Sequence, residues 1–161
     1  ATALGPNDDD GAGEDNGRAG DAQLEALLPP PGDETFDASV LTINFTPTGN
    51  QIRFSYVFAS EEYNEYVGSE FNDLFAFFVG GTNYAVLPGT STPVAINNVN
   101  CGSSIDPFFP PTNCSFFIDS ANDASLFEIF FVLNRVSPWC SQNRANGLPV
   151  AVSLWATSFS W

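Results

Sequence analysis

The run of six apolar residues Leu74-Phe75-Ala76-Phe77-Phe78-Val79 limits the fold more than any other stretch of the chain. A strand with one solvent face alternates apolar and polar side chains, whereas this run has no polar position, so both of its faces must be covered. Gly80-Gly81-Thr82-Asn83 follow directly, and glycines in such a segment are typical of a turn between antiparallel strands. The sequence therefore predicts a buried strand that turns back on itself.

Other short strands surround this run and are separated by turn residues. Residues 40–46 and 52–58 alternate apolar and polar side chains on either side of Pro47-Thr48-Gly49-Asn50, so we expect them to pair as a hairpin. The only helical signal covers residues 22–28, before Pro29. This pattern predicts an all-β fold, an antiparallel β-sandwich or jelly-roll-like architecture. The remaining predicted strands are residues 84–87, 94–99, 127–133 and 150–155.

Composition divides the 161 residues into three parts, although the length suits one domain. Residues 1–34 form an acidic loop segment rich in Gly and Asp, and residues 35–129 contain the predicted sandwich core. Every acidic residue lies at or before Glu128, whereas all three Trp follow it. We therefore expect residues 130–161 to be a divergent C-terminal segment.

The formal charge of −15 excludes several classes of function. The chain has nineteen acidic residues and four Arg, with no Lys and no His. Such a chain repels nucleic acid and anionic membrane surfaces and favours cations as partners. The absence of His removes the commonest general base and zinc ligand. No phosphate-binding loop, no G-x-S-x-G elbow and no apolar stretch of about 18 residues is present. We expect a protein that is not an enzyme and has no transmembrane segment.

Two acidic segments are candidates for Ca²⁺ binding. Residues 8–21 alternate acids with glycines but fail the spacing of an EF-hand, while residues 58–73 place five acids directly before the buried run. Adjacent carboxylates repel one another unless a cation or hydrogen bonds offset the repulsion. The candidate metal ligands are Glu61, Glu62, Asp73, Asp15 and Asp21.

Three other interpretations of these acids stay open. The simplest is a loop at Glu62, Tyr63 and Asn64 whose carboxylates accept backbone N–H groups, with Phe71 as its apolar anchor. A second is a carbohydrate-binding or carbohydrate-active module that uses two carboxylates of residues 61–73 and has glycans as partners. A third is adaptation to salt, with no site at all.

The three cysteines allow one disulfide. Cys101 and Cys114 flank the loop GSSIDPFFPPTN and form the most plausible pair in an oxidising compartment, which leaves Cys140 free. Three unpaired thiols are the alternative.

Several segments resemble one known family. They are ALGPN (residues 3–7), DNG (15–17), GDAQLEAL (20–27), TFDASVLTINFTPTG (35–49), FSYVFASEEYNEYVGSEFNDLFAFFVGG (54–81) and LPGTSTPVAINNVN (87–100). Together they are similar to the choice-of-anchor L domain of bacterial secreted and surface proteins, whose members carry different C-terminal anchoring signals. The resemblance implies an exported β-rich domain with no established catalytic activity or defined ligand.

The resemblance weakens after Ile129, and the chain begins where the family would already be inside its domain. We therefore expect an incomplete domain with a divergent, truncated or frame-shifted C-terminus. The function expected is a secreted or cell-surface structural or adhesion module. Its expected partners are other surface or matrix proteins, or further copies of the chain joined through edge strands.

Overall fold

The computed structural model describes residues 16–29, 34–46, 48, 56–60, 62–118, 130–131 and 150–156. The predictions for Asp15, Glu61 and Cys140 lie outside these residues. The elements are α1 (Ala22–Glu25), β1 (Ser39–Phe45), β2 (Tyr56–Val57), β3 (Leu74–Val79), β4 (Thr82–Asn83), β5 (Val94–Ala95), the 3₁₀ turns Ile96–Asn98 and Cys114–Phe116, β6 (Phe130–Phe131) and β7 (Val150–Ala156).

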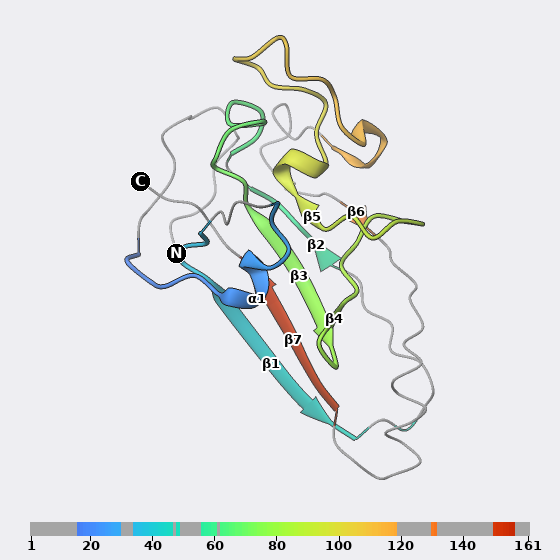
Figure 1. The fold of residues 1–161 in the computed structure, drawn as a ribbon. Helices are drawn as coiled ribbons and strands as arrows, with labels where there is room; N and C mark the ends of the chain where they lie inside the picture. Colours follow the sequence, from blue (N-terminus) through green and yellow to red (C-terminus); the bar gives the residue numbers. More distant parts are fainter. Residues whose placement is uncertain are drawn as a thin grey trace.

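The main sheet has the strand order β1-β7-β3-β4, and β5 also pairs with β3 (Figure 1). All of these pairs are antiparallel. β7 lies between β1 and β3, and its register with β1 runs without a break from Ser39 opposite Ala156 to Phe45 opposite Val150. The last predicted strand therefore occupies the interior of the sheet, although it follows most of the chain in sequence.

The predicted hairpin of residues 40–46 and 52–58 is wrong in the part that the structure describes. β1 pairs with β7, while β2 pairs with β6 in a second, two-stranded sheet. The two sheets meet where the ring of Tyr56 stacks on Phe75 of β3, with 4.4 Å between the centroids. Alternation of side chains identified β1 as a strand but carried no information about its partner.

β3 is buried at all six positions, which confirms the prediction that both of its faces are covered. Phe75, Phe77 and Val79 belong to the larger apolar cluster. The alternate residues of β3 pack with Leu24 of α1, which Figure 1 shows in front of the sheet. The six apolar side chains of β3 thus join two apolar clusters.

The turn after β3 is tighter than predicted. Gly80 and Gly81 have φ values of 58° and 80°, so they form the left-handed turn that two-residue hairpins require. β4 follows at once, and the strand expected over residues 84–87 forms only an isolated bridge at Val86. The strand expected over residues 94–99 stops at Ala95 and continues as a 3₁₀ turn.

The fold class is all-β, as predicted. Within the described residues the four-residue α1 is the only α-helix, and no helix there is long and apolar enough to cross a membrane.

Candidate functional site

The segment of residues 58–73 between β2 and β3, called the acidic loop below, is held in place by apolar and aromatic side chains. Tyr63 and Val67 are buried in the larger apolar cluster. The Tyr63 hydroxyl donates a 2.6 Å hydrogen bond to the carbonyl of Val99. Phe71, the expected anchor, is partly buried and packs edge to face on Tyr66. The loop therefore lies against the core through Tyr63 and Val67, neither of which the sequence singled out as an anchor.

Asp73 and Glu62 are both buried, and Ser60 contacts both of them. The Ser60 hydroxyl donates to Oδ2 of Asp73 at 2.6 Å and accepts the backbone N–H of Glu62 at 3.0 Å. The Asp73 carbonyl also accepts the N–H of Ile96 at 3.1 Å. Burial, and after it the negative charge of Asp73, raise the pKa of Tyr63. Asp73 thus joins the acidic loop to the segment that follows β5.

Asp21 has a local structural role. Its side chain accepts the backbone N–H of Gln23 at 2.7 Å, which caps the N-terminus of α1. Its own N–H donates to the hydroxyl of buried Thr35 at 2.8 Å. The capping role explains why an acidic residue occupies this position, and it requires no bound cation.

No group of three or more His, Cys, Asp or Glu is placed to hold a metal ion within the described residues. Glu62, Asp73 and Asp21 are therefore not brought together as one ligand cluster there. Asp15 and Glu61, the other two candidate ligands, lie outside the described residues.

Sequence reasoning missed several polar residues that organise the loops. Asp37 is buried with a φ of 48°, and its carboxylate accepts the N–H groups of Asn16 and Arg18, both at 2.8 Å. Asn97 accepts the N–H of Gly68 at 2.6 Å and donates to the carbonyl of Ser69 at 2.9 Å. The available signal was the Asn-rich run of residues 96–100, because Asn side chains compete with strand pairing for backbone groups.

A disulfide joins Cys101 and Cys114, the pair that the sequence favours. It closes the loop of residues 102–113, called the disulfide loop below. Antiparallel backbone bonds of 2.8 and 3.0 Å between Asn100 and Thr112 support its base. The Asn100 side chain is fully buried, and its Oδ1 accepts the N–H groups of Gly102 at 3.0 Å and Thr112 at 3.3 Å.

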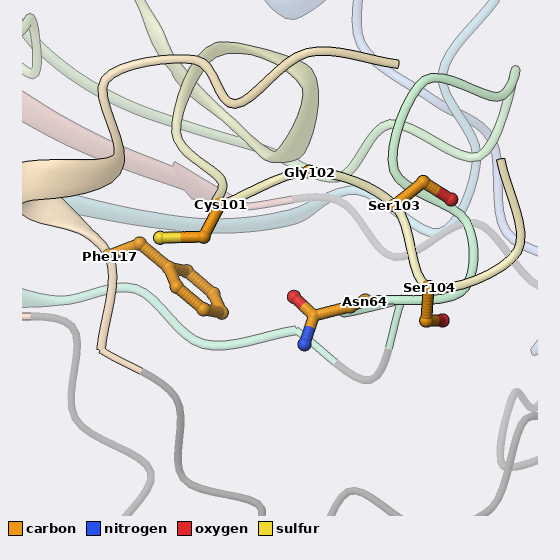
Figure 2. Close-up of a pocket in the computed structure, with 6 residues that line it drawn as sticks. All are labelled: Asn64, Cys101, Gly102, Ser103, Ser104 and Phe117. Atoms are coloured by element: carbon orange, nitrogen blue, oxygen red, sulfur yellow. The ribbon is translucent and has the colours of Figure 1, made fainter. Parts of the chain in front are cut away.

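A pocket of about 420 Å³ lies where this loop meets the acidic loop. In Figure 2 the Phe117 ring and the Asn64 amide face each other across it. The Ser104 backbone N–H donates to the Asn64 carbonyl at 3.1 Å, which links the two loops beside the pocket. The described lining consists of Asn64, Cys101, Gly102, Ser103, Ser104 and Phe117.

The family model of the choice-of-anchor L domain matches residues 1–138. The chain belongs to the choice-of-anchor L domain family. No curated protein and no solved structure matches it. The match confirms the resemblance found in the segments between residues 3 and 100.

Membership of the choice-of-anchor L family indicates a surface-associated or secreted protein. The acidic loop, the disulfide and the pocket all lie within the matched residues. β7 lies beyond them but still forms the strand between β1 and β3. In this choice-of-anchor L chain, residues outside the family match thus take part in the main sheet.

Proposed function

We propose that the chain is a non-enzymatic structural or adhesive module of the cell surface or extracellular space, which associates with a second copy of itself through β1. The observation that carries the proposal is the exposed apolar surface of β1. Val40, Leu41 and Ile43 are 48%, 55% and 45% exposed, although all three are apolar. Surface-associated family membership supports the extracellular setting.

The residues of β1 include none of the features that usually protect an edge strand. Charged side chains, Pro and β-bulges normally prevent edges from pairing with other chains. The sequence SVLTINF of β1 has no charge and no Pro, and its seven-residue register with β7 has no bulge. In the described sheet β1 is the end strand, with β7 as its strand partner.

A second copy fits this edge better than a charged partner does. Two β1 strands related by a two-fold axis would pair antiparallel and place uncharged residues opposite uncharged residues. The rest of the molecule opposes association, because each copy has a formal charge of −15. We therefore expect self-association to strengthen as salt screens this repulsion.

Sedimentation velocity over a range of protein and salt concentrations tests the proposal. Ile43→Lys should keep the chain monomeric at concentrations where the unmodified chain associates. Ile105→Lys is the matched control, since Ile105 is 69% exposed but lies in the disulfide loop, and it should associate normally. A chain that stays monomeric at high salt, or an Ile43→Lys variant that associates normally, contradicts the proposal.

Ca²⁺ binding by the acidic residues stays a prediction. Glu62 and Asp73 are both buried and both contact Ser60, Glu62 through its backbone N–H and Asp73 through its carboxylate, and Glu61 precedes them in the chain. Calorimetric titration with Ca²⁺, together with the melting temperature of the chain and of Glu61→Gln, tests it. A melting temperature that Ca²⁺ leaves unchanged contradicts a calcium site.

A further inference from the structure

The described lining of the pocket between the acidic loop and the disulfide loop is uncharged, although the chain is strongly acidic. Its described lining residues are one amide, two hydroxyl residues, one glycine, one disulfide sulfur and one aromatic ring. A bound cation would need several carboxylate or carbonyl oxygens around it, whereas the described lining has no carboxylate and a single side-chain amide. An anion would meet the repulsion of a chain with a formal charge of −15. The chemistry of the lining therefore favours a neutral, polar ligand.

The Phe117 ring supplies the apolar part of this lining. It packs on Tyr63 with 4.8 Å between the ring centroids, and this contact restricts its orientation. Figure 2 shows the ring directed toward the Asn64 amide, across the space beside Cys101. A fixed aromatic face opposite hydrogen-bonding groups is typical of a site that takes a ligand with one apolar and one polar side.

Asn64 and Ser104 supply the polar part. The Oδ1 atom of Asn64 is buried and has no hydrogen-bond partner among the described residues, and Figure 2 shows it turned toward Cys101 and Phe117. An unsatisfied buried acceptor is unusual in a folded protein, and a donor from a water or a ligand that reaches it would satisfy it. Ser104 is exposed next to it and carries a hydroxyl that can both donate and accept.

The pocket wall is also held rigidly. Beyond the disulfide and the Asn100 bonds, the Ser103 hydroxyl donates to the carbonyl of Glu65 at 3.3 Å and accepts the N–H of Asp106 at 3.1 Å. Ser103 therefore connects the disulfide loop to the acidic loop. A preformed site loses little conformational entropy when a ligand binds, which matters most for ligands that bind weakly.

We propose that this pocket binds a neutral sugar unit of a glycan. A sugar ring has C–H groups that suit the Phe117 face and hydroxyls that suit Asn64 and Ser104. The volume of about 420 Å³ accommodates a mono- or disaccharide unit. The site is separate from β1 and uses none of the carboxylates of residues 61–73. The proposal of sugar binding can therefore be tested independently of the proposal of self-association.

The test is ligand-observed NMR and calorimetry with maltotriose, cellotriose and triacetylchitotriose, and with trigalacturonic acid as an anionic comparison. At least one neutral trisaccharide should bind with a Kd of about 1 mM or tighter. Ser104→Trp, which fills the pocket from an exposed position, should weaken binding at least about tenfold. Ser91→Trp is the matched control, because Ser91 is exposed in the turn before β5, and it should bind as the unmodified chain does.

Melting temperatures of both Trp variants show whether they remain folded, and Ser104→Val serves as a smaller change that removes the hydroxyl alone. The proposal is overturned by any of three results: no neutral trisaccharide binds, the anionic one alone binds, or folded Ser104→Trp and Ser104→Val both bind normally. The Ile43→Lys variant should bind the sugar unchanged, which separates this site from the β1 edge.

Discussion

The hydroxyl group of Tyr63 donates a 2.6 Å hydrogen bond to the backbone carbonyl of Val99, 36 residues later in the chain. Both residues are buried in the larger apolar cluster. The bond attaches the acidic loop to the segment that precedes the disulfide. The position of the loop therefore depends on a neutral phenol in the core as well as on its carboxylates.

Replacing Tyr63 with Phe should lower the free energy of unfolding by about 1–2 kcal/mol, because the buried Val99 carbonyl loses its donor while the ring still fills its site. Urea denaturation followed by fluorescence measures the change. A Tyr63→Phe variant as stable as the unmodified chain would show that the hydroxyl bond makes no net contribution.

The same residue should make stability depend on alkaline pH. Burial, and after it the charge of Asp73, raise the pKa of Tyr63, so folding favours the neutral phenol. Its contribution is complete below about pH 10, the pKa of an unfolded tyrosine, and is lost as pH rises toward the higher folded pKa. Burial also raises the pKa of Tyr56.

We expect the free energy of unfolding to fall above about pH 10. The fall should be shallower in Tyr63→Phe and shallowest in the double variant with Tyr56→Phe. Urea denaturation at a series of pH values measures these slopes, and identical slopes in all three proteins would refute the assignment.

Ser60→Ala should destabilise the chain by about 2 kcal/mol, since Asp73 loses a short charge-assisted bond inside the protein and Glu62 loses the acceptor of its N–H. Ser91→Ala, at an exposed position, is the control and should stay within about 0.5 kcal/mol. The coupling energy from a double-mutant cycle with Asp73→Asn isolates the bond. A coupling near zero would mean that Ser60 and Asp73 act independently.

Local patterns predicted the strands well where side chains alone decide the outcome. β3 has apolar residues on both faces, and β1 alternates, so each was recognisable without knowledge of its neighbours. The disulfide pair was favoured because the two cysteines flank one short loop. These features depend on residues close together in sequence.

Pairing and polar networks could not be read in the same way. β1 pairs with β7 more than a hundred residues later, and a period of two residues does not specify a partner. The acids at Asp21 and Asp73 suggested a cation, but in the structure Asp21 caps α1 and Asp73 bonds to Ser60. An acidic residue looks the same in the sequence whether it binds a cation or accepts hydrogen bonds from the protein. Only the donors that surround it in the structure distinguish the two roles.

Removing the disulfide should cost about 2–4 kcal/mol, as expected for a loop of this length. The double variant Cys101→Ser and Cys114→Ser should melt earlier than the unmodified chain under oxidising conditions and equally in the presence of a reductant. Cys140→Ser is the control, because it removes a thiol and leaves the pair intact. If reductant does not lower the melting temperature of the unmodified chain, the disulfide does not stabilise it.

Gly68 and Gly89 give a matched pair for the contact between the acidic loop and the disulfide loop. Both have positive φ, +86° and +76°, so alanine is strained at either position. A Cβ at Gly89 meets nothing within 4 Å, whereas one at Gly68 would lie closer to the Phe109 ring than van der Waals contact allows. The two substitutions therefore differ chiefly in this collision.

We expect Gly89→Ala to cost about 1 kcal/mol and Gly68→Ala about 3 kcal/mol or more, since Phe109 must leave its site or the loop must shift. Combining Gly68→Ala with Phe109→Ala should recover part of the loss, because the smaller side chain removes the collision. Thermal and urea unfolding of the four proteins provide the measurement. Equal costs at the two glycines would show that Phe109 does not pack against Gly68 in solution, and the rigid junction beside the proposed sugar pocket would then lack one of its contacts.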